Sequence, residues 1–190
     1  MFKKTLILLL GLTLSSFAVT AMEIEGVEIP DTVSLPNSDT TLVLNGAGIR
    51  EKFFMDIYIG ALYLESKTND VNTIMNDTGA ASVLMHFLYS EVSKEKLTDG
   101  WTEGFEKNLS RTTMQAIEER ITMFNKLFQT VHEGDVIRLD YLPESGTQVR
   151  INGEWRGKVE GNDFFRALLA IWLGEKPVTK SLRKSMLGEE

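Results

Sequence analysis

One segment of eleven residues, MDIYIGALYLE at 55–65, is apolar on both of the faces that alternate along a strand. The two faces consist, in turn, of Asp56, Tyr58, Gly60, Leu62 and Leu64, and of Ile57, Ile59, Ala61 and Tyr63. A strand with one solvated face alternates apolar and polar residues, so this pattern predicts a central strand that is covered on both sides. The fold must therefore contain a sheet with further layers packed on it.

The other elements are predicted in groups. Strands are expected within 23–46 and at 81–89, 136–141, 146–151 and 154–160, the last two joined by an Asn152-Gly153 hairpin turn. Helices are expected at 71–76, from Ser93, from Thr113 with a stripe running to Phe128 and Val131, at 162–174 with Asn162 as its cap, and after Pro177. Strands and helices that are grouped rather than strictly alternating favour an α+β fold with an antiparallel sheet.

The N-terminal residues have the layout of a secretory signal peptide. MFKK is basic, TLILLLGLTLSSF is apolar, and AVTA ends in small residues, so cleavage is expected after Ala21. A membrane anchor is the alternative, but the apolar run is short for a bilayer span and is interrupted by Gly11 and serines. We therefore expect a signal peptide at 1–21, a single domain at 22–190, and a periplasmic location in a Gram-negative bacterium.

Composition narrows the chemistry. The net charge is −7 and becomes more negative when Lys3 and Lys4 leave with the signal peptide, which argues against binding nucleic acid or anionic membrane surfaces. There is no cysteine, hence neither disulfide nor thiol chemistry, and His86 and His132 stand too far apart to suggest a metal motif. The NGAG run at 45–48 lacks the other residues of a phosphate-binding loop. We expect no cofactor and no metal.

The segment LVLNGAGIREKFFMDIYIGALYLE resembles the signature of the chalcone isomerase-like family. The resemblance continues through the segment holding Trp101 and Asn108 and into FFRALLAIWLGEKPVTKSLRKSMLG, so it covers nearly the whole chain after residue 21. It implies an open-faced β-sandwich, in which helices are layered over a large antiparallel sheet. The family includes plant enzymes that cyclise chalcones, members that bind long-chain fatty acids, and exported bacterial members without a settled role.

The resemblance also implies a set of site residues. Arg50 matches the arginine that faces the ligand, and Tyr58 stands where the isomerases have a catalytic threonine and the fatty-acid binders a tyrosine. Trp101 replaces the catalytic tyrosine of the isomerases, while Asn108 keeps their ligand-binding asparagine. The remaining positions, where the isomerases hold the polar end of the substrate, are occupied by Ile171 and Trp172.

These replacements remove catalytic chemistry. The indole of Trp101 can donate but cannot accept or act as a phenolic acid, and Ile171 forms no hydrogen bond. The polar groups available to stabilise an anionic transition state are reduced to Arg50, Tyr58 and the amide of Asn108. The chain is therefore not expected to cyclise chalcones.

The leading interpretation is a non-catalytic binder of a small amphipathic molecule such as a fatty acid. Arg50 would hold the acidic head, Tyr58 would donate beside it, and an apolar pocket including Leu62, Met85 and Phe105 would take the chain. Two other functions remain open: an isomerase or lyase that uses Arg50 to stabilise an oxyanion, and an envelope interaction protein whose pocket is filled by its own side chains.

Two residues keep structural alternatives. Arg50 could pair with Asp56 or Glu51 and support the neighbouring turn instead of meeting a ligand. The Asn108 amide could bond a ligand, a strand carbonyl or the end of its own helix.

Overall fold

The structure is a computed structural model that describes residues 21–189. The predicted signal peptide therefore lies outside the described residues, apart from Ala21. The strands are β1 (Met22–Ile24), β2 (Val27–Ile29), β3 (Thr32–Ser34), β4 (Thr41–Lys52), β5 (Met55–Leu64), β6 (Ala81–Phe87), β7 (Glu91–Val92), β8 (Val131–His132), β9 (Val136–Leu142), β10 (Gly146–Ile151) and β11 (Glu154–Val159). The helices are α1 (Val71–Asn76), α2 (Lys94–Asn108), α3 (Arg111–Lys126), α4 (Asn162–Leu173) and α5 (Lys180–Met186).

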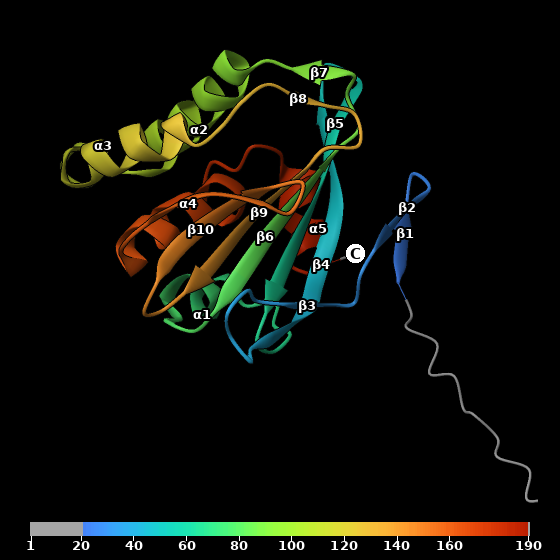
Figure 1. The fold of residues 1–190 in the computed structure, drawn as a ribbon, viewed down its shortest axis with the longest axis horizontal. Coiled ribbons are helices and arrows are strands. Elements are labelled where there is room, and N and C mark those ends of the chain that lie inside the picture. The colour runs from blue at the N-terminus through green and yellow to red at the C-terminus, as the bar shows by residue number, and fades with distance from the viewer. Residues whose placement is uncertain (1–20, 190) are drawn as a thin grey trace, which may run out of the picture.

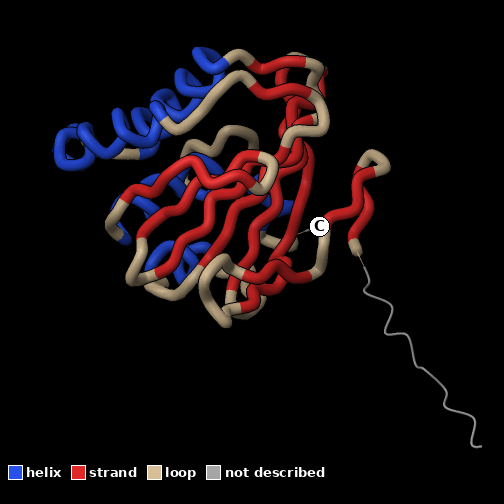
Figure 2. Tube along the Cα trace, viewed as in Figure 1, coloured by secondary structure: helices blue, strands red, loops and turns tan. Residues whose placement is uncertain are grey.

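Seven strands form one antiparallel sheet in the order β11-β10-β9-β6-β5-β4-β3 (Figures 1 and 2). Two small antiparallel pairs, β1 with β2 and β7 with β8, stand apart from it. Strand β5 lies inside the sheet, between β4 and β6. Its residues belong to the cores on both faces of the sheet, as its two apolar faces predicted. The α+β class and the antiparallel sheet are confirmed.

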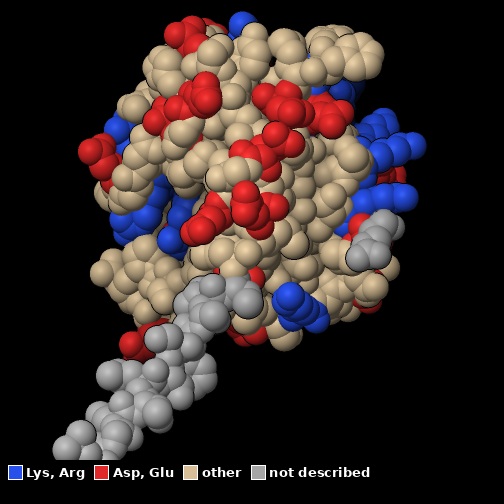
Figure 3. Space-filling view, turned by 90° about the vertical axis from the view of Figure 1, so that its right-hand side faces the viewer, with Lys and Arg blue, Asp and Glu red and all other residues tan. Residues whose placement is uncertain are grey.

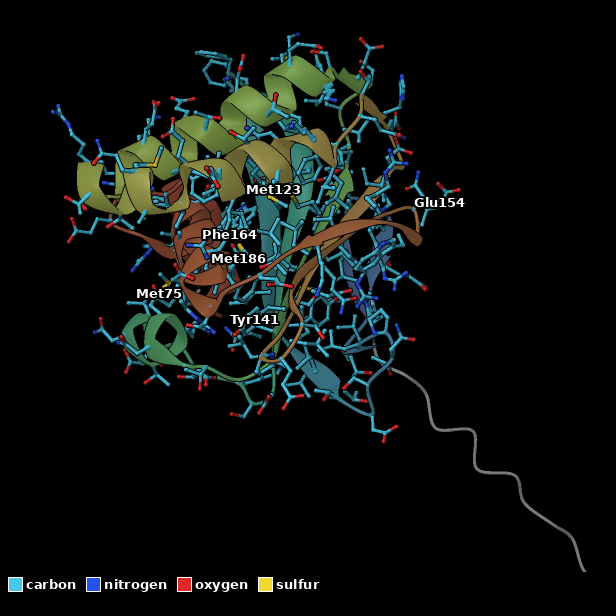
Figure 4. The ribbon with its side chains drawn as sticks, turned by 60° about the vertical axis from the view of Figure 1, so that its left-hand side comes forward. Met75, Met123, Tyr141, Glu154, Phe164 and Met186 are labelled. Atoms are coloured by element: carbon cyan, nitrogen blue, oxygen red, sulfur yellow. The ribbon has the colours of Figure 1, made fainter. Side chains whose placement is uncertain are left out.

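The main core lies between the sheet and the helices. It includes eight residues of α4 and aromatic side chains of α2 and α3. Figure 4 labels three of its buried members, Tyr141 of β9, Phe164 of α4 and Met186 of α5. A smaller core on the opposite face joins Ile59, Ala61 and Tyr63 of β5 to the segment 24–35. Tyr63 fixes that segment, because its hydroxyl donates to the Pro30 carbonyl at 2.9 Å.

The NGAG run has a packing role. Helix α5 lies directly on β4, and a Cβ atom at Gly46 would overlap the carbonyl oxygen of Ser185. A Cβ at Gly48 would meet the Ser185 side chain, and one at Gly60 on β5 would press on Leu182. The absence of side chains at these positions lets the helix backbone approach the sheet closely.

Several predicted boundaries were wrong. Strand β4 runs to Lys52, so Arg50 lies within it and beyond the range 23–46 in which the first strands were expected. The predicted alternation of faces also fails at Ile57, which joins Tyr58 in the helix-side core where the register shifts beside Arg50. Helix α3 begins at Arg111, because Ser110 rather than Thr113 is its cap, and it ends before Phe128 and Val131.

The start of α4 also differs from the prediction. Gly161, with φ of 100°, is the residue before the helix, so Asn162 is its first residue and makes no capping bond. The Asn162 amide instead donates to the Tyr141 hydroxyl at 2.9 Å. Asp163 supplies the negative charge of the first turn and forms two hydrogen bonds with Arg120 of α3.

The surface carries the negative charge that the sequence requires. Figure 3 shows one side of the molecule, on which acidic side chains gather across the middle and basic ones lie toward the edges. No helix within residues 21–189 is long and apolar enough to span a bilayer.

Candidate functional site

A cavity of about 190 Å³ lies between the sheet and α2, and it contains Arg50. Its apolar lining comes from β5, β6, β7, α2, α4 and the segment before α5: Ile57, Tyr58, Met85, Phe87, Val92, Leu97, Trp101, Ile171 and Val178. It adjoins an outer groove of about 400 Å³, and Arg50, Lys52 and Gly100 line both spaces. Most of the apolar residues of the cavity are buried, whereas Phe53 and Met55 of the groove are exposed, so the cavity is the inner chamber and the groove the outer vestibule.

The Arg50 side chain stands at the boundary of these two spaces and forms no salt bridge with the described residues. The register pairs Arg50 with Tyr58, and the guanidinium carbon lies 5.5 Å from the centre of that ring. The buried Nε has no acceptor, and within residues 21–189 the guanidinium forms no salt bridge or hydrogen bond. The alternative pairing with Asp56 or Glu51 is therefore not formed in this structure.

Tyr58 is 3% exposed and receives a hydrogen bond of 2.9 Å from the Trp172 indole nitrogen. Burial raises the pKa of Tyr58, and the neighbouring Arg50 charge and the Trp172 hydrogen bond lower it by less. The phenol therefore keeps its proton at neutral pH. The hydroxyl oxygen accepts a hydrogen bond from Trp172, and the hydroxyl can still donate one hydrogen bond of its own.

Trp101 lines the cavity and is buried in an aromatic cluster with Phe124, Phe128 and Trp172, whose ring centres lie 5.4–5.7 Å from its own. Its indole nitrogen is buried and has no acceptor among the described residues. Ile171 also lines the cavity, from α4. A Cβ at Gly104 of α2 would lie 2.8 Å from the Ile171 side chain, so that glycine sets the close approach of the two helices.

Four of the residues proposed for the pocket do not line it. Asn108 faces the loop after α4, where its amide donates to the Gly104 and Lys176 carbonyls and accepts from the Lys176 nitrogen. Leu62 and Phe105 belong to the packed core. Trp172 likewise lies outside the cavity lining and reaches the site only through its bond to Tyr58.

The cavity lining is basic although the chain is acidic. Five basic residues line it, against two acidic ones, Glu51 and Glu103; the basic ones are Arg50, Lys52, Lys96, Lys107 and Lys176. The hydrogen bond that Glu103 accepts from Lys107 lowers the pKa of Glu103, and the charges of Lys107, Lys52 and Arg50 lower it by smaller amounts. The arrangement favours an anion beside Arg50.

These lysines were not predicted from the sequence, although a signal for them is present. Lys96, Gly100, Glu103 and Lys107 recur at intervals of four, three and four along α2, which places them on one helical stripe beside Trp101. Within residues 21–189 no three His, Asp or Glu side chains gather in a way that could hold a metal ion.

A second hollow, of about 600 Å³, lies between α1 and α5 and is lined by Met75, Lys180, Arg183 and neighbouring residues. None of the predicted site residues lines it. The Arg50 cavity therefore remains the candidate functional site.

The comparisons with known proteins agree with this architecture. A solved structure of a fatty-acid binding protein of Arabidopsis thaliana superimposes with a TM-score of 0.73, covering 88% of this chain and 96% of that one at 16% identity. No curated protein matches the sequence. The family model described as chalcone isomerase-like matches residues 21–188, and the chain therefore belongs to the chalcone isomerase-like family.

Proposed function

We propose that this protein is an exported, non-catalytic member of its family that binds a small amphipathic anion such as a fatty acid. The observation that carries the proposal is Arg50, whose guanidinium borders the cavity and forms no salt bridge or hydrogen bond with the described residues. Keeping an arginine partly buried and unpaired is costly, and an acidic ligand head would remove that cost.

The bound ligand would place its carboxylate against Arg50 and its chain in the inner cavity. A planar guanidinium can bind a carboxylate through two parallel hydrogen bonds, and the Tyr58 hydroxyl lies beside it as a neutral donor. The chain would contact Met85, Trp101 and Ile171. No base is required, and the raised pKa of Tyr58 disfavours a role for its phenolate.

Gly100 supports the same proposal. It lies inside α2, where a glycine destabilises a helix by about 1 kcal/mol relative to alanine, and a Cβ at this position would have no atom within 4 Å. Gly100 lines both the cavity and the groove. A glycine that weakens the helix is explained if the space that it leaves open is needed for a ligand.

The Arabidopsis neighbour, described as a fatty-acid binding protein, adds support at the level of the fold. Export rests on the N-terminal sequence, and we propose the periplasm as the site of action.

The proposal is tested by mass spectrometry of the organic extract from freshly purified protein, with Arg50→Ala beside the wild type. We expect the wild type to carry a carboxylic acid in near-stoichiometric amount. The variant should bind that acid about ten- to a hundredfold more weakly, the effect of removing a hydrogen bond to a charged group.

Arg150→Ala is the matched control. Arg150 also lies over an aromatic ring, 5.6 Å from the centre of Trp155, and its Nε is also buried without an acceptor, but it lines none of the three cavities described above. Its replacement should leave the acid bound. A wild type that is empty and whose thermal stability does not respond to added fatty acid would overturn the proposal and favour an envelope interaction protein.

A further inference from the structure

The tip of the β4–β5 hairpin exposes two phenylalanines to solvent. Phe53 is 80% exposed and Phe54 is fully exposed, and Met55 follows them. The large apolar side chains exposed within residues 21–189 are Met22, Phe53, Phe54, Met55, Met123 and Trp155. Three of these six are consecutive, so the hairpin tip is the most concentrated exposed apolar feature of the described surface.

The backbone at this tip is unfavourable for phenylalanine. The two residues form a two-residue turn with φ of 50° and 62°, in the left-handed region that suits asparagine and glycine. The same molecule uses the expected residues elsewhere: the β10–β11 turn is Asn152-Gly153, with φ of 52° and 80°. The β4–β5 turn therefore carries two aromatic rings at a cost in stability, and their exposure means that packing within the monomer does not offset it.

The tip lies next to the entrance of the candidate site. Phe53 and Met55 line the outer groove together with Arg50 and Lys96, and the hairpin ends near β7 and the start of α2 (Figure 1). The Lys52 ammonium lies 5.8 Å from the centre of the Phe53 ring. An apolar tip with a basic residue at its base thus borders the opening through which a ligand would enter.

We infer that Phe53 and Phe54 insert into the interfacial region of a lipid bilayer and hold the groove against the membrane. A phenylalanine buries about 150–250 Å², so the pair supplies far less than the roughly 800 Å² per partner of a stable protein interface. Such a small apolar tip is sufficient for reversible membrane contact, where aromatic rings and lysines partition together.

The local charge indicates which bilayer it would contact. Residues 50–56, REKFFMD, carry two basic and two acidic side chains, so the hairpin is neutral, and the whole chain has a net charge of −7. A neutral tip on an acidic protein suits a zwitterionic bilayer and is repelled by an anionic one. This inference does not require a ligand in the cavity.

The test replaces the tip with the turn that the backbone prefers. Phe53→Asn combined with Phe54→Gly should raise Tm by about 2–8 °C, because strain is relieved, and should lower partitioning onto phosphatidylcholine vesicles at least about tenfold. Since the variant is expected to be more stable than the wild type, loss of vesicle binding cannot be attributed to unfolding. Adding phosphatidylglycerol to the vesicles should weaken wild-type binding.

Trp155→Ser is the control, because it removes an exposed aromatic residue from the other hairpin, whose end is marked by Glu154 in Figure 4. It should leave vesicle binding unchanged. The inference would be overturned if the wild type did not bind vesicles, or if Trp155→Ser lost as much vesicle binding as the double variant Phe53→Asn with Phe54→Gly. It would also be overturned if sedimentation velocity showed a wild-type dimer that the double variant does not form.

The membrane inference and the proposed ligand binding can be tested separately. Arg50→Ala should lose the extracted acid but keep vesicle binding, whereas Phe54→Gly, at a position that lines none of these cavities, should do the reverse.

Discussion

The phenol of Tyr58 is buried beside Arg50, and this environment links the stability of the protein to alkaline pH. Burial raises the pKa of Tyr58, whereas in the unfolded chain a tyrosine ionises near pH ~10. The stability that the protein gains from keeping this phenol neutral is therefore fully present below about pH 10 and is lost as the pH rises above that value. Urea denaturation between about pH 8 and pH 11 should show a shallower alkaline decline for Tyr58→Phe than for the wild type.

Tyr63 provides an internal comparison, because burial also raises its pKa. Tyr63→Phe should likewise remove part of the decline, and the double variant should remove more than either alone. Identical pH slopes for the wild type and Tyr58→Phe would mean that the phenol is reached by water in solution.

The sequence identified Arg50 and Tyr58 but not what each contacts. The Asp56 pairing was plausible from spacing alone, yet the register shift beside Arg50 sets Asp56 opposite Glu51 and leaves Arg50 opposite Tyr58. The bond between Trp172 and Tyr58 joins residues 114 positions apart, and no local pattern encodes such a contact. Motif resemblance therefore points to candidate residues, whereas the hydrogen bonds of those residues depend on how distant elements pack.

At the scale of elements, two glycines should respond in opposite directions to alanine. Gly46→Ala would place a methyl group against the Ser185 backbone, which cannot move away without lifting α5, so we expect a loss of about 1–3 kcal/mol or more in the free energy of unfolding. Gly100→Ala adds a methyl group in open space within α2 and should gain up to about 1 kcal/mol. Urea denaturation of the two variants measures both, and a neutral Gly46→Ala would show that α5 is not held closely on β4.

Elements with strong periodicity were predicted well, and their ends were not. The start of α2 at Ser93 is as predicted: the Ser93 hydroxyl accepts from the Lys96 nitrogen, and Leu97, Trp101 and Phe105 recur on the buried face of the helix. The starts of α3 and α4 were misplaced because Ser110 and Gly161 act at positions where Thr113 and Asn162 were equally good caps by sequence. The close contact of α5 with Gly46 and Gly48 was also missed, since a Gly-rich run does not reveal which element will lie on it.

Over the whole molecule, the sheet separates two cores, and the candidate site occupies one end of the larger. Helices α2 and α4 cover this face, Lys96 and Lys107 of α2 lie in the cavity lining, and the hairpin tip extends beside the outer groove. The double-faced pattern of β5 predicted the layers. It could not predict the cavity, whose volume depends on how side chains from six elements and the segment before α5 fit together.

The shape of this cavity predicts how affinity should depend on ligand length. An inner chamber of about 190 Å³ is below the roughly 300–1,000 Å³ typical of ligand pockets, and the adjoining groove of about 400 Å³ is open. For a series of saturated fatty acids, each methylene that enters the chamber should tighten binding about fourfold, and methylenes that extend into the groove should add much less. Calorimetric titration should therefore show a break in the plot of binding free energy against chain length. Gly100→Phe, which fills the open space beside α2, should move that break to shorter chains without destabilising the helix. A slope that stays steep to the longest acids would mean that the chamber enlarges on binding, and no slope at all would mean that the chain does not enter it.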